Sequence, residues 1–221
     1  MKGTNKNSIA NYNIQPGDII AFSGEDGFSG LIQWKTNSIV SHVGVVFAAS
    51  TQDIHIVEAT NTQFYQNSND AGVKHQRLND HINNYEGMMW WLPLNKSARN
   101  ALNITAFNAF INSHHGRPYD TTQAIASAID LKYNALFASA IHNNECFSKL
   151  FCSELAAAAL EAGGVIKTIN ASEVTPADLC RFNIFADRYY QLKGKATTIN
   201  GYNSVDPNGF GEYSSPMAVN C

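Results

Sequence analysis

Short apolar runs separated by turn residues fill the first half of the chain, and runs of this length are typical of β-strands. The first run follows the turn signal Pro16-Gly17-Asp18. Valine, isoleucine and aromatic residues, which favour strands, are concentrated in these runs. The predicted strands cover residues 19–22, 40–48, 54–59 and 88–94. Residues 60–87 are polar and irregular, and no element is predicted there.

Helical periodicity dominates the second half. Leu102, Ala106 and Phe110 recur at i, i+4 and i+8, which predicts a helix over residues 97–115 that ends at Gly116. Further elements are predicted as a short helix at 29–35, one or two alanine-rich helices at 121–141, a helix at 152–162 and a last strand at 188–192. The pair Gly163-Gly164 follows the helix at 152–162, where a left-handed cap is favoured.

The second and third predicted strands are joined by residues 49–53 only, a length that favours an antiparallel hairpin over a crossover. If the hairpin is centred on Ser50, His42 and Glu58 lie directly opposite each other. Opposed residues share a face of the sheet, with Cβ atoms about 5 Å apart. This pairing depends on the register, because a shift by one residue removes it.

Composition narrows the class of protein. The chain has 221 residues, of which 44% are hydrophobic and 15% charged, with a net charge of −3. This hydrophobic content supports one well-buried domain, and the low charge offers no basic field, so nucleic acid is excluded as an expected partner. Residues 1–14 and the polar residues 194–221 are predicted to be extensions.

The chain shows no sequence signal for a membrane or for export. Residues 1–7 lack the apolar stretch of a secretory signal, and the longest apolar run, 43–49, is far shorter than the ~20 residues that span a bilayer. We therefore expect a soluble protein that is cytoplasmic by default. Delivery by a phage or a dedicated secretion system is compatible with the same sequence.

Cys152 is the candidate nucleophile. It begins the alanine-rich helix, where unpaired N–H groups and the helix dipole favour a thiolate and can hold an oxyanion. The alternative is that Cys152 is a small buried hydrophobic residue, as many free cysteines are.

His42 and Glu58 are the candidate base and its partner. His42 lies on an apolar strand between the small residues Ser41 and Gly44. A carboxylate that contacts one ring nitrogen fixes the tautomer and stabilises the imidazolium, and Glu58 stands within an otherwise apolar strand. The alternatives are a histidine satisfied within the core and a carboxylate at the rim of the sheet.

Other residues are weaker candidates. We predict that three residues contact substrate: Ser41, Ser153 and Tyr119, which lies in the rigid turn 116–120. For Tyr119, a packing role is an equal possibility.

None of the seven histidines falls in a metal-ligand pattern, and the four cysteines fit neither a disulfide scaffold nor a zinc site. We therefore expect no metal and no cofactor, and a reducing compartment. The sequence leaves open whether Cys146 or Cys221 forms a disulfide, and it assigns no role to Cys180.

Six segments in a fixed order resemble a known family. They are Pro16-Gly17-Asp18-Ile19-Ile20, Ser41-His42-Val43-Gly44-Val45-Val46, Ile56-Val57-Glu58-Ala59, Gly116-Arg117-Pro118-Tyr119-Asp120, Phe151-Cys152-Ser153-Glu154-Leu155 and Val174-Thr175-Pro176-Ala177-Asp178-Leu179. Together they are similar to the circularly permuted papain-like amidases of the NlpC superfamily, YiiX type, and more distantly to folds of the lecithin:retinol acyltransferase kind.

The resemblance implies an α+β fold, in which an antiparallel sheet or partial barrel packs against the helix that carries the cysteine. The catalytic domain would cover residues 15–193. The implied activity is cleavage of an amide or ester bond through an acyl-enzyme on Cys152, with His42 as general base and Glu58 orienting it. Expected substrates are peptides, other amides or lipid-like acyl compounds.

Two other functions remain open. Related permuted folds pass the acyl group to a second acceptor, and residues 130–150 are long enough to cover a cleft and exclude water. A catalytically silent binding or structural module on the same fold is the third possibility. The reactivity of the Cys152 thiol distinguishes that module from an enzyme.

Overall fold

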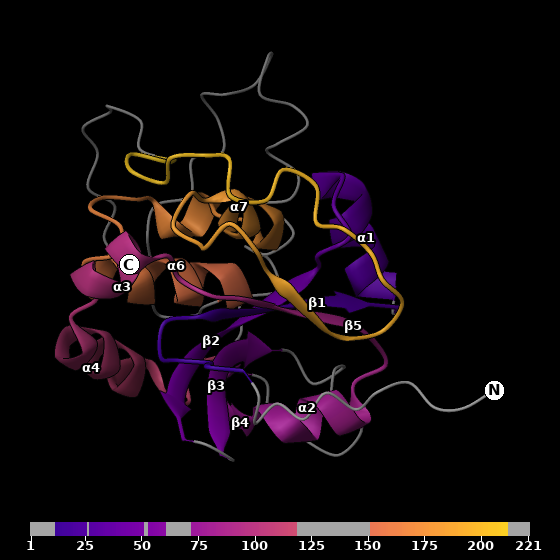
Figure 1. Ribbon diagram of the computed structural model, residues 1–221, viewed down its shortest axis with the longest axis horizontal. Helices are drawn as coiled ribbons and strands as arrows, with labels where there is room; N and C mark the ends of the chain where they lie inside the picture. The colour runs from indigo at the N-terminus through magenta and orange to yellow at the C-terminus, as the bar shows by residue number, and fades with distance from the viewer. Residues whose placement is uncertain (1–11, 26, 51–52, 61–71, 119–150, 212–221) are drawn as a thin grey trace.

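The computed structural model describes residues 12–25, 27–50, 53–60, 72–118 and 151–211 (Figure 1). Within these residues, six strands form one antiparallel sheet in the order β4-β3-β2-β1-β5-β6. The strands are β1 (Ile19–Gly24), β2 (His42–Ala49), β3 (Ile54–Thr60), β4 (Gly72–Arg77), β5 (Gly87–Leu92) and β6 (Tyr190–Lys193). The sheet is open, with β4 and β6 at its edges.

Helices cover both sides of this sheet. They are α1 (Gly27–Thr36), α2 (Leu78–Asn84), α3 (Lys96–Ala101), α4 (Ile104–His114), α6 (Cys152–Ala162) and α7 (Pro176–Arg181), together with a 3-10 turn, η3 (Ala171–Glu173). In Figure 1, α6 and α7 lie above the strands and α2 lies below them. The expected α+β class, an antiparallel sheet packed against helices, is thus confirmed. No helix in the described ranges has the length and apolarity needed to cross a membrane.

The sheet is buried on both faces, which explains the uninterrupted apolar run of β1. Ile19 and Ala21 belong to the core on the α6 side, whereas Ile20 and Phe22 belong to a second core on the α2 side. All six residues of β1 are buried. Alternate residues of a strand point to opposite faces, so a strand between two cores has no polar face to show.

Asp18 fixes the turn before β1 to the far end of β5. Its carboxylate accepts hydrogen bonds from the indole N–H of Trp91 and the backbone N–H of Leu94, both at 2.9 Å. The guanidinium of Arg99, from α3, also contacts this carboxylate. Asp18 is completely buried, and such a charge is tolerated only when it is paired and hydrogen-bonded.

Helix α6 is the central helix of the molecule. Its residues 152–160 are all buried, and it packs on β2 and β3 while contacting α4, α7 and η3. Four consecutive alanines at 156–159 allow this close approach from several sides. Gly164, just beyond the helix, has a φ of 77°, the left-handed conformation expected for one of the two glycines there.

Most predicted elements are present within a few residues. The predicted strands at 19–22, 40–48, 54–59, 88–94 and 188–192 correspond to β1, β2, β3, β5 and β6, and the predicted helices at 29–35 and 152–162 correspond to α1 and α6. The single helix predicted at 97–115 was wrong, because α3 and α4 are separate. Asn103 caps α4 by accepting hydrogen bonds from the N–H groups of Thr105 and Ala106. The predicted helices at 121–141 lie outside the described residues.

Residues 60–87, for which no element was predicted, contain β4 and α2. The predicted hairpin register was also wrong, by two residues. Val45 pairs with Val57, and a bulge between Val46 and Ala48 shifts the ladder. Continuing this register places Gly44, rather than His42, opposite Glu58.

Residues 194–211 pack against the rest of the molecule. Ile199 is buried in the core on the α6 side, and the indole N–H of Trp90 donates to the carbonyl of Thr197 at 3.1 Å. Val205 and Phe210 form isolated bridges with Phe182 and Ile169. The domain boundaries at residues 14 and 193 stay predictions.

Candidate active site

Cys152 is the first residue of α6, as predicted. It is 3% exposed and is a free thiol. The preceding residue, Phe151, has extended backbone angles, and its N–H donates to the Glu154 carboxylate at 3.4 Å. The first N–H groups of a helix have no acceptor within it, so the thiol lies beside the positive end of an eleven-residue helix.

His42 is the first residue of β2, and its ring contacts both other predicted members of the site. Nε2 donates to Oε2 of Glu58 at 2.6 Å. A side-chain hydrogen bond also links His42 to Cys152. The structure therefore brings together Cys152, His42 and Glu58, with the imidazole between the thiol and the carboxylate.

Glu58 reaches His42 diagonally across the two strands. Gly44 has no side chain, and a Cβ built there would lie 3.5 Å from the Cβ of Glu58 and 3.2 Å from Cδ1 of Ile56. The Glu58 side chain therefore passes beside Gly44 to the imidazole two residues away on the same face. The predicted contact is correct although the register that suggested it was not, because residues two apart on a strand share a face.

The neighbouring charges favour the ionised forms of His42 and Glu58. Burial alone would lower the pKa of His42, but the Cys152 thiolate and the Glu58 carboxylate outweigh it and raise this pKa to about 10. Burial alone would raise the pKa of Glu58, but the charges and hydrogen bonds of His81 and His42 lower it to about 2. At neutral pH, His42 is therefore an imidazolium and Glu58 is a carboxylate.

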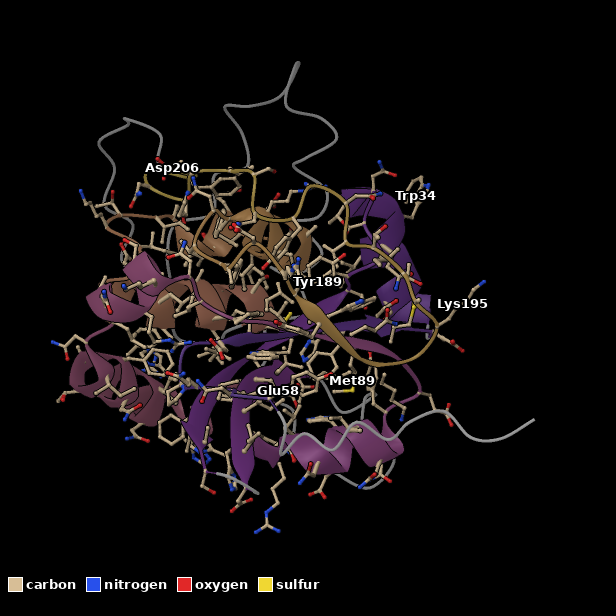
Figure 2. All side chains as sticks on the ribbon, in the orientation of Figure 1. Trp34, Glu58, Met89, Tyr189, Lys195 and Asp206 are labelled. Atoms are coloured by element: carbon tan, nitrogen blue, oxygen red, sulfur yellow. The ribbon has the colours of Figure 1, made fainter. Side chains whose placement is uncertain are left out.

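A second histidine, His81, also contacts Glu58. Nε2 of His81, on α2, lies 3.0 Å from Oε1 of Glu58, so each carboxylate oxygen contacts one imidazole. Figure 2 shows Glu58 in the interior near the strands, with Lys195 and Asp206 at the periphery. Sequence reasoning missed His81, because its segment has no periodic pattern. The signal that was present is a histidine three residues after Leu78, a spacing that puts both on one helix face.

Phe22, a member of the core on the α2 side, packs against this site. Its ring centroid lies 5.3 Å from that of His42, 5.4 Å from that of His81 and 5.1 Å from that of Tyr85. Phe22 pairs with His42 in the ladder between β1 and β2. An aromatic ring beside both imidazoles keeps them in a low-dielectric environment, which strengthens their interactions with Glu58.

The residues predicted to bind substrate have other contacts. The hydroxyl of Ser41 accepts from the N–H of Gly24 at 3.1 Å, and that of Ser153 donates to the carbonyl of Val174 at 2.6 Å. Both serines are buried. Tyr119 lies outside the described residues, so its role stays a prediction.

In the part of the chain that the structure describes, no three His, Cys, Asp or Glu residues form a group that could hold a metal ion. At Glu58, the Nε2 atoms of His42 and His81 each contact one carboxylate oxygen.

Comparison with known proteins shows a distant likeness to a solved structure. No family model matches the sequence, and no curated protein matches it significantly. The crystal structure of metalloprotein yiiX from Escherichia coli O157:H7 superimposes with a TM-score of 0.45 and 19% sequence identity, over 69% of this chain and 67% of that one. The chemistry of the site must therefore be judged from its own side chains.

Proposed function

We propose that this chain is a cysteine hydrolase that cleaves an amide or ester bond through an acyl-enzyme on Cys152. His42 is the proton carrier, and Glu58 orients it. The observation that carries the proposal is the position of the His42 ring, which is hydrogen-bonded both to the thiol and to a buried carboxylate. This is the arrangement of nucleophile, base and orienting group that activates a thiol.

The proposed reaction has two steps. His42 holds the proton of the Cys152 thiol, and the thiolate attacks the carbonyl carbon. The imidazolium then protonates the leaving amine or alcohol, which departs and leaves a thioester. In the second step His42 takes a proton from water, the resulting hydroxide displaces the thiolate, and the acid is released. The first N–H groups of α6 are suited to stabilise the oxyanion that forms in both steps.

The proposed thioester can pass its acyl group to water or to a second acceptor. Transfer to an amine or alcohol instead of water would use the same residues and the same thioester. The segment 130–150, which was expected to favour transfer, lies outside the described residues. Product analysis with and without an added amine acceptor separates the two reactions.

A trapped acyl group on Cys152 tests the function. After incubation with cell extract, mass spectrometry of the wild-type protein is expected to find an adduct on Cys152. The adduct should be absent from Cys152→Ala and at least about 100-fold reduced in His42→Ala, because a thiol without its base is a weak nucleophile.

Cys180→Ala is the matched control. Cys180 is fully buried, and burial raises the pKa of its thiol, so its removal should leave the adduct on Cys152 unchanged. Equal labelling of Cys152 in the wild-type and His42→Ala proteins would contradict the proposal and support a catalytically silent module.

A further inference from the structure

We infer that His81 is a positioning residue of this site: it holds the second oxygen of Glu58, so that the first oxygen keeps His42 aligned with Cys152. The set of side chains that activates the thiol would then have four members rather than three. This inference rests on the proposed function, because it describes how the same thiol is activated. His81 itself does not contact Cys152 in this scheme and acts through Glu58 and His42.

The geometry of Glu58 is the first argument. Its two oxygens are 2.6 Å from Nε2 of His42 and 3.0 Å from Nε2 of His81. A carboxylate with two fixed donors on opposite oxygens cannot rotate without breaking one of the contacts. If the donor on one oxygen is lost, one of the contacts that oppose this rotation is gone, and the contact with His42 is held less firmly.

Burial is the second argument. Glu58 is 1% exposed, His42 3% and His81 4%. A buried carboxylate with too few donors becomes protonated or moves toward water. Burial pushes the pKa of Glu58 upward, and the charge of His81 is the largest of the influences that pull it down. His81 therefore helps to keep Glu58 anionic, and an anionic Glu58 favours the imidazolium form of His42.

The anchoring of His81 is the third argument. Leu78 and His81 are the buried residues of α2, and the N–H of Tyr85 donates to the carbonyl of His81 at 2.8 Å. The Phe22 ring packs edge-on against both His81 and Tyr85. On the neighbouring strand β4, Lys74 is the register partner of Glu58. The imidazole is thus held by its own helix and by the Phe22 ring of β1.

The test measures the rate at which iodoacetamide alkylates Cys152 as a function of pH, in the full-length protein. In His81→Leu, which keeps an apolar side chain of similar size, the rate at pH 7 should fall about tenfold and the midpoint of the profile should move to higher pH. In His81→Gln, which keeps an N–H donor, the profile should return most of the way toward the wild type. Thermal unfolding of each variant verifies that it is folded.

His55→Ala is the matched control. His55 is a histidine of β3 that contacts Asp53 at 3.1 Å, and it should leave the profile unchanged. A wild-type profile for folded His81→Leu would overturn the inference. So would equal losses in folded His81→Leu and His81→Gln, because a purely structural role does not depend on the donor. Failure of the proposed function looks different, since the wild type and His42→Ala would then give the same profile.

Discussion

At the scale of single residues, the site depends on one imidazole that touches a thiol on one side and a carboxylate on the other. His42 is buried beside Phe22, and a buried imidazole would ordinarily be neutral. Its interactions with Cys152 and Glu58 reverse this preference and raise the pKa of His42 to about 10. His42 therefore carries a proton at neutral pH.

The protonation of His42 can be measured directly. In a pH titration followed by NMR with labelled histidine, His42 should stay charged until about pH 10, and Cys152→Ala should lower its pKa by about one unit or more. A raised pKa means that the folded state binds this proton more tightly than the unfolded state. The resulting stability is complete below pH 6.5 and is lost as the pH rises through about 10. Titration of His42 near 6.5 in the wild type would refute this picture.

At the scale of elements, the sequence was informative where apolar residues recur and uninformative elsewhere. β1 and α6 have strong patterns because they are buried on both sides. β4 is an edge strand with the sequence GVKHQR, in which only Gly72 and Val73 are buried, so its pattern is too short to recognise. The seven residues of α2 contain two buried positions, and one of them is His81. The missed member of the site therefore belongs to a segment that tertiary contacts define.

The break between α3 and α4 shows the same limit, because it depends on a cap. Asn103→Ala removes an oxygen that accepts from two backbone N–H groups and should lower the free energy of unfolding by about 1 kcal/mol. Denaturant unfolding measures the change. Asn100→Ala, at an exposed position inside α3, is the control and should change stability by less than about 0.5 kcal/mol. Equal effects of the two substitutions would mean that Asn103 is not a functional cap.

At the scale of the whole molecule, two cores share one sheet, and the site lies where they meet. His42 and Glu58 are on the α2 face of their strands, whereas Cys152 belongs to the core on the α6 side. The contact between Cys152 and the other two residues is made at His42, the first residue of β2. At that end of the strand, α6 on the other face can reach the imidazole. The α+β class and the three predicted site residues could be inferred from sequence. The bulge at 46–48 could not, because it changes the register without changing the hydrophobic pattern.

The core on the α6 side extends into residues 194–211, which look polar in sequence. Ile199→Ala should lower the free energy of unfolding by about 2 to 5 kcal/mol, because it leaves a cavity against that core. Thr198→Ala, one residue away and exposed, should have almost no effect. If both variants unfold like the wild type in denaturant, this segment does not contribute to the stability of the fold.

The order of these parts along the chain has a consequence for synthesis. β2, β3, β4 and α2 follow one another, so the two imidazoles and their carboxylate are contributed by neighbouring elements. Domains begin to form on the ribosome from the N-terminal side, and contacts between nearby elements close first. His42, Glu58 and His81 can therefore come together before Cys152 has been translated. Cys152, on α6, is then added to contacts that the preceding elements have already formed.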